Sequence, residues 1–162
     1  AKHYKLKYTV IRPANVYGPR MPNKGLYGFL NRWIAYALQD KPIPIWGTGG
    51  QVRDFTYVED IAKAYPMVMN NPKTFGKPYL LCTGRGVTLL GLAQTIFEKV
   101  GKTPKIEYFP PKAGDIQRFI GNYGKAKFEL GWTPTTDLSC GLDLTIDFVK
   151  NNMDRYKEVN LF

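Results

Sequence analysis

The segment GTGGQVRD, residues 47–54, contains two residue types that often bind phosphate. Glycine-rich turns can present main-chain N–H groups to phosphate oxygens, and an Arg guanidinium can pair with two of those oxygens at once. Arg53 is therefore a candidate anion ligand, and Arg118 in GDIQR is a second one. Taken alone, each arginine is better explained by a structural role, and Arg53 beside Asp54 is typical of a surface ion pair.

The glycines themselves do not predict a dinucleotide-binding turn. That turn follows a buried strand and opens directly into a helix, whose N-terminus faces the pyrophosphate. Here the glycines are followed by QVRDFTYV, which is typical of a strand. We therefore expect a tight turn between two extended segments.

Other reactive side chains are few. His3 is the only histidine, which excludes a metal site built from several histidines and argues against a histidine-dependent triad. Cys82 lies in the apolar run YLLC, far from Cys140. We expect a buried thiol in a reducing, cytoplasmic compartment rather than a disulfide.

The chain of 162 residues carries a net charge of +10. A basic surface attracts nucleic acid, membranes or phosphorylated small molecules, or it is simply solvated. The basic residues are scattered, which argues against a nucleic-acid-binding domain. No apolar run approaches the roughly 18 residues of a membrane helix, and we expect neither a signal peptide nor membrane association.

Hydrophobic patterning predicts an α/β fold in which short strands alternate with helices. The strands are expected at 8–13, 42–46, 51–58, 78–83 and 105–109, and a Pro/Gly loop at 15–28. The helices are expected at 29–39, 59–71, 88–101, 125–131 and 138–152.

Local signals place the ends of several helices. Thr88 and Ser139 are the predicted N-caps of their helices, and Gly101 and Gly131 are the predicted stops. Pro66 lies inside a helical pattern and is expected to kink it.

Five segments then occur in order: RPANVYGP, PIPIWGTGGQVRDFTYVEDIAKA, GDIQR, KAKFELGWTP and LSCGL. From about residue 4 to 150, the chain resembles the C-terminal half of extended short-chain dehydrogenase/reductases that act on nucleotide sugars. That group includes UDP-glucose 4-epimerases, dTDP-glucose 4,6-dehydratases and UDP-glucuronate decarboxylases. The chain departs from the family's D-x-S-K-A motif, since it reads NYGKA with Asn122 and Gly124.

The resemblance implies a fold with two parts. Residues 1–27 would be the end of an NAD-binding Rossmann-like domain, and residues 28–162 a substrate-binding α/β region. The last strand of the parallel sheet would then lack its neighbours and leave an edge open to a partner.

The resemblance also implies site residues for a nucleoside diphosphate sugar. Asn15 would contact the ligand near its diphosphate, and Trp46 would stack on the base. Arg53 and Arg118 would hold the diphosphate or ribose. The backbone at Pro13 and Ala14 would lie near the nicotinamide of NAD.

In the family, the Gly-rich NAD turn and the Tyr-x-x-x-Lys pair precede the first of these segments. Two such strings do occur here, Tyr108 to Lys112 and Tyr123 to Lys127, but the first contains two prolines and the second lies at the wrong place. We therefore expect the chain alone to bind NAD poorly and not to catalyse. A Rossmann half or a homodimer partner would complete it.

Two alternatives remain open. The chain could be a non-catalytic relative with a binding or regulatory role, against which the two arginines and Trp46 argue. A steroid or flavonoid substrate is disfavoured, because such a ligand needs no paired phosphate-binding arginines.

Overall fold

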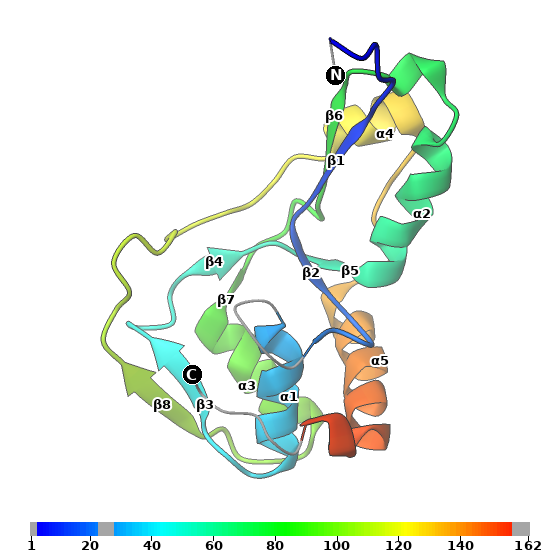
Figure 1. The fold of residues 1–162 in the computed structure, drawn as a ribbon. Helices are drawn as coiled ribbons and strands as arrows, with labels where there is room; N and C mark the ends of the chain where they lie inside the picture. Colours follow the sequence, from blue (N-terminus) through cyan, green and yellow to red (C-terminus); the bar gives the residue numbers. More distant parts are fainter. Residues whose placement is uncertain (1–2, 23–27, 157–162) are drawn as a thin grey trace.

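The computed structural model describes residues 3–22 and 28–156 and confirms the α/β class (Figure 1). The strands are β1 (Val10–Pro13), β2 (Asn15–Tyr17), β3 (Ile43–Trp46), β4 (Val52–Arg53), β5 (Phe55–Tyr57), β6 (Pro78–Leu81), β7 (Val87–Thr88) and β8 (Ile106–Phe109). The helices are α1 (Phe29–Leu38), α2 (Val58–Val68), α3 (Leu89–Lys99), α4 (Gly124–Leu130) and α5 (Leu138–Asn151), with 3-10 turns at Pro72–Thr74 and Met153–Tyr156.

Strand pairing is mostly parallel. β1 pairs with β6, β2 with β5 and β3 with β8 in parallel, whereas β4 and β7 are antiparallel. The chain from β1 to β2 changes partner within two residues, because Ala14 N–H donates to Leu81 and Asn15 N–H donates to Asp54. The first strand is therefore paired, and the expectation that it would lack a neighbour is wrong.

Two groups of buried side chains hold the fold. The larger core lies among α1, α3, α5 and the strands β3 and β5. The smaller core joins α2 and α4 to β1 and β6, and its largest member is Trp132. In Figure 1 the smaller core forms the upper part of the molecule and the larger core the lower part. The boundary proposed between residues 27 and 28 stays a prediction.

Helix ends follow local chemistry at most of the predicted places. The Thr88 hydroxyl accepts a hydrogen bond from Gly91 N–H at 3.1 Å, and Gly131 ends α4 in the left-handed conformation. Ser139 is not the N-cap of α5. Asp137 takes that position, and its carboxylate accepts from Cys140 N–H at 3.0 Å. Both residues suit a cap, so the choice depends on where the backbone enters the first turn.

Three segment boundaries differ from the predictions. The first three residues of the predicted 15–28 loop form β2, because β5 supplies them with a parallel partner, and residues 23–27 lie outside the described part. Val58 belongs to α2 and not to the preceding strand. α2 ends at Val68, two residues after Pro66, where the missing N–H weakens the last turn.

The Tyr17 hydroxyl is buried in the larger core, and none of the described residues forms a hydrogen bond with it. Burial raises the pKa of Tyr17 well above its usual value, and nearby acidic groups such as Asp137 raise it further. The hydroxyl also lies against α5, where a Cβ built on Gly141 would approach it to 2.0 Å. Only a glycine fits at that point of the helix without displacing Tyr17.

We expect Tyr17→Phe to raise the free energy of unfolding by about 1 kcal/mol, since it removes a buried polar group that gains no bond. Tyr79→Phe is the matched control, because the Tyr79 hydroxyl donates to Glu129 at 2.8 Å. That control should lose about 1 kcal/mol. Urea unfolding of both variants measures the difference, and equal losses would show that the Tyr17 hydroxyl has a partner.

Candidate functional site

Trp46 ends β3 and is half-buried. Its ring stacks on Phe109, its partner in β8, with centroids 5.4 Å apart and planes at 25°. The Lys112 ammonium lies 3.8 Å from the Trp46 ring centroid, in cation–π geometry. Trp46, the predicted base-stacking residue, is therefore part of a packed aromatic pair with a cation next to its ring.

Arg53 lies in β4, and its side chain is only 14% exposed. One terminal nitrogen pairs with Asp115 at 2.7 Å, and the other donates to the Val52 carbonyl at 3.0 Å. The ion-pair partner is thus Asp115, which is 62 residues away, and not the adjacent Asp54. The charge of Arg53 is held at the protein surface by a partner that a phosphate could share or replace.

Gln51 connects this pair to Trp46. Its amide nitrogen donates to the Trp46 carbonyl at 2.8 Å and to the second oxygen of Asp115 at 3.0 Å. The loop that carries Lys112 and Asp115 therefore lies across both Trp46 and Arg53. In Figure 1 this loop runs from β8 along the outer side of β4 towards α4.

Arg118 follows on the same loop, and its main chain forms a parallel bridge with Val52, the residue before Arg53. Its side chain is exposed and makes no hydrogen bond or ion pair within residues 3–22 and 28–156. The structure thus brings the backbone of the two predicted arginines together, while only Arg53 is fixed by side-chain contacts.

Asn15, Pro13 and Ala14 lie at the end of β1 and the start of β2. The Asn15 amide donates to the Asp54 carbonyl at 2.9 Å, and the Ala14 N–H donates to Leu81 at 2.8 Å. Pro13 is exposed. Asn15 is thus joined to Asp54, the residue after Arg53, whereas Pro13 and Ala14 pair with Leu81 of β6.

Asp54 is fully buried and pairs with no cation in the part of the chain that the structure describes. Its carboxylate accepts hydrogen bonds from Thr83 N–H at 2.9 Å, the Thr83 hydroxyl at 2.6 Å, Gly84 N–H at 2.9 Å and Gly121 N–H at 3.2 Å. A buried carboxylate is tolerated when its oxygens are satisfied in this way. Asp54 therefore fixes the loop after β6 and the approach to α4 against β5.

Asp60 plays the same part at the other end of β5. It is fully buried and accepts from Lys63, from Thr136 N–H and from both the N–H and the hydroxyl of Thr135. Burial raises its pKa, but the hydrogen bonds from Thr135, Lys63 and Thr136 together lower the pKa to about 2. Through these bonds Asp60, in the first turn of α2, holds residues 135–136 in place.

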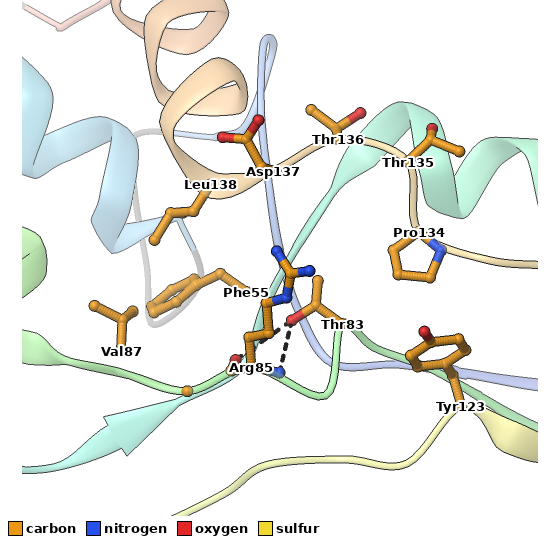
Figure 2. Close-up of a pocket in the computed structure, with 11 residues that line it drawn as sticks. Phe55, Thr83, Arg85, Val87, Tyr123, Pro134, Thr135, Thr136, Asp137 and Leu138 are labelled. Carbon is orange, nitrogen blue, oxygen red and sulfur yellow. Dashed lines mark hydrogen bonds between the residues drawn. The ribbon is translucent and has the colours of Figure 1, made fainter.

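The segments held by these two aspartates form opposite walls of a pocket of about 240 Å³ (Figure 2). Arg85 and Thr83 come from the loop after β6, and Thr136 and Asp137 lie at the start of α5. The Arg85 guanidinium has no ion-pair partner in the described part of the chain. None of the six predicted site residues lines this pocket.

Lys112 and Asp115 were missed in the sequence as site residues. A signal for Asp115 was present, because it stands in the same GDIQR segment that singled out Arg118. Lys112 precedes that segment and was considered only within the Tyr108 string. In the described part no hydrogen bond joins the Tyr and Lys side chains of either Tyr-x-x-x-Lys string.

Residues 1–82 match the profile of the NAD dependent epimerase/dehydratase family. The chain belongs to this family. A putative UDP-glucose 4-epimerase of Methanocaldococcus jannaschii is 33% identical over 149 residues, which are 92% of this chain and 48% of that protein. The chain spans about half the length of the curated relatives it matches.

Solved structures of the family have the same fold. A UDP-glucose 4-epimerase from Thermotoga maritima with UDP-glucose superposes with a TM-score of 0.88 at 37% identity, covering 94% of this chain and 49% of that one. A dTDP-glucose 4,6-dehydratase from Bacillus anthracis in complex with NAD gives 0.86 at 29% identity, covering 98% and 50%. The described fold is thus the last part of a Rossmann-like parallel sheet plus the small α/β region of an extended short-chain dehydrogenase/reductase.

NAD-dependence of the family raises the question of which described residues fit that cofactor. The glycines after β6, Gly84 and Gly86, lead into β7, and the turn at 47–50 leads into β4. Neither opens a helix, so the described residues contain no strand-to-helix glycine turn for a pyrophosphate. At the end of β1 the Ala14 N–H is already used by the Leu81 carbonyl, and the nicotinamide contact of Pro13 and Ala14 stays a prediction.

Among residues 3–22 and 28–156, no group of three or more His, Cys, Asp or Glu side chains could hold a metal ion. No helix there has the length and apolar character needed to cross a membrane. Both cysteines are free, and Cys82 is buried as predicted.

We expect Asp60→Asn to lower the free energy of unfolding near neutral pH by about 2 kcal/mol, the order of a pKa change from 3.8 to about 2. Because the folded-state pKa is depressed, this stabilisation is present above the unfolded value and is lost as pH falls from about 4 to about 2. Urea unfolding across that range measures it. Glu59→Gln, an exposed neighbour, is the control, and equal effects of both substitutions would contradict the assignment.

Proposed function

We propose that this chain binds a nucleoside diphosphate sugar and is the substrate-binding part of an NAD-dependent epimerase or dehydratase. The observation that carries the proposal is the convergence of Trp46, Arg53 and Lys112 at the ends of β3 and β4. Membership of the family and the relatives that act on UDP-sugars or dTDP-sugars support it.

The chemistry of the site suits the two halves of such a ligand. A guanidinium with one anionic partner can take a diphosphate oxygen in its place or beside it, and it binds oxygens in a planar fork that Lys lacks. The Trp46 indole is in contact with the Phe109 ring and the Lys112 ammonium, and a base that takes the place of the ammonium would stack on the indole. Lys112 adds positive charge next to both.

We assign Arg118 to the outer side of the same diphosphate, and Asn15 to the part of the sugar nucleotide near its diphosphate. Pro13 and Ala14 would face the nicotinamide, and the cofactor's phosphates would be held by residues beyond the described part. Oxidation and reduction of the sugar are the chemistry that bound NAD supplies in this family. This chain's contribution is to hold and orient the ligand, which lowers the entropic cost of the reaction. We propose that the whole protein is a cytoplasmic, NAD-dependent isomerase or lyase.

Calorimetric titration of the folded chain with UDP, dTDP and GDP tests this proposal, with NAD as the comparison ligand. We expect one diphosphate nucleotide to bind and Arg53→Ala to weaken it by roughly tenfold or more, the loss of one charge-assisted hydrogen-bonded pair. NAD should bind more weakly than that nucleotide.

Arg85→Ala is the matched control, since it removes an arginine from the pocket in Figure 2 and leaves the Trp46 site intact. Weakening by Arg85→Ala with no effect of Arg53→Ala would move the ligand to that pocket. No binding of any nucleotide by a chain with normal circular dichroism would contradict the proposal for this chain.

A further inference from the structure

We propose that Gln51 is the positioning residue of this site, because its amide aligns the aromatic end with the anion-binding end. This inference rests on the proposed function for its ligand, but its structural part is independent of any ligand. The Gln51 side chain belongs to neither end, and no role was predicted for it. It is 5% exposed, at the point where the glycine turn enters β4.

The Gln51 amide is held in one orientation by its hydrogen bonds. Its nitrogen has two acceptors, the Trp46 carbonyl at 2.8 Å and Asp115 Oδ2 at 3.0 Å. Rotating the amide by half a turn would direct its oxygen at a carbonyl and a carboxylate, which repel it. The two acceptors therefore fix which way the amide points.

This orientation of the Gln51 amide reduces the stability of the fold. The Gln51 Oε1 atom is buried and has no hydrogen-bond partner within residues 3–22 and 28–156. A buried acceptor without a donor reduces stability, and an apolar side chain of similar size would avoid that cost. The role of Gln51 is therefore to position Trp46 and Asp115 relative to each other, and its contribution to stability does not account for its presence.

The two hydrogen bonds of the Gln51 amide hold Asp115 and the loop that carries it. Asp115 uses Oδ2 for Gln51 and Oδ1 for Arg53, so the position of the Arg53 guanidinium depends on a carboxylate that Gln51 fixes. Lys112, three residues earlier on the same loop, lies over Trp46. Loss of the Gln51 donor should free this loop and separate the charged groups from the indole.

Gln51→Glu tests this inference with almost no change in shape. At neutral pH the new carboxylate faces Asp115 and the Trp46 carbonyl, and it should repel both. Near about pH 5.5 it should be protonated, since burial and a neighbouring carboxylate raise the pKa of a Glu above its ordinary value of about 4.3. The protonated acid again has one donor for Asp115.

The measurement is UDP-glucose affinity by calorimetry at about pH 7.5 and about pH 5.5, taken as the ratio of variant to unsubstituted chain. UDP-glucose is used because its diphosphate is esterified at both ends and does not titrate in this range. We expect about tenfold weaker binding at the higher pH and about threefold or less at the lower pH. Gln94→Glu, on the exposed side of α3, makes the same chemical change away from the site and should give a ratio near one at both pH values.

A ligand-free readout separates this inference from the proposed function. Trypsin cleavage after Lys112 should be faster in Gln51→Glu than in the unsubstituted chain at the higher pH, and not in Gln94→Glu. If cleavage is faster in Gln51→Glu but the unsubstituted chain binds no UDP-glucose, the positioning role of Gln51 is retained and the proposed function is overturned. Unchanged cleavage, or an affinity ratio that does not depend on pH, would overturn the role of Gln51.

Discussion

Two buried carboxylates at the two ends of β5 organise this structure. Asp54 lies just before the strand and Asp60 shortly after it, and each satisfies its oxygens with groups from segments far along the chain. An ionised carboxylate removed from water is costly unless donors surround it, so both segments are held firmly in place. Through Asp54 the loop after β6 and the start of α4 are fixed, and through Asp60 the start of α5.

This arrangement separates two roles within one short motif. In the segment QVRDFTYVED, the two aspartates face inward and hold the fold, whereas Arg53 pairs with Asp115. Gln51 and Arg53 carry the link to the loop at 110–122. The buried residues beside Arg53 hold its partly exposed guanidinium in a fixed position. Such preorganisation favours phosphate binding, because the cation does not have to be ordered when the ligand arrives.

The sequence predicted the parts of this fold that local chemistry decides. The periodic apolar positions of α1, α3 and α5 identify helices, and Thr88 and Gly131 mark helix ends because cap geometry depends on adjacent residues. β2, β4 and β7 are two or three residues long and exist through their pairing, so no local pattern separates them from loops. The partner of Arg53 could not be predicted, because Asp115 is brought beside it only by the path of the loop after β8. The resemblance to the family pointed to Trp46 and Arg53, while Lys112 and Gln51 emerge from the packing.

The central claim is that a nucleoside diphosphate sugar lies at Trp46 and Arg53. A crystal structure of the chain soaked or grown with UDP-glucose tests it most directly. The account predicts the diphosphate on the Arg53 guanidinium and the base against the Trp46 ring, with Lys112 or Asp115 displaced from its present contact. Density for the ligand in the pocket of Arg85 and Thr136, with Arg53 still paired only to Asp115, would contradict it.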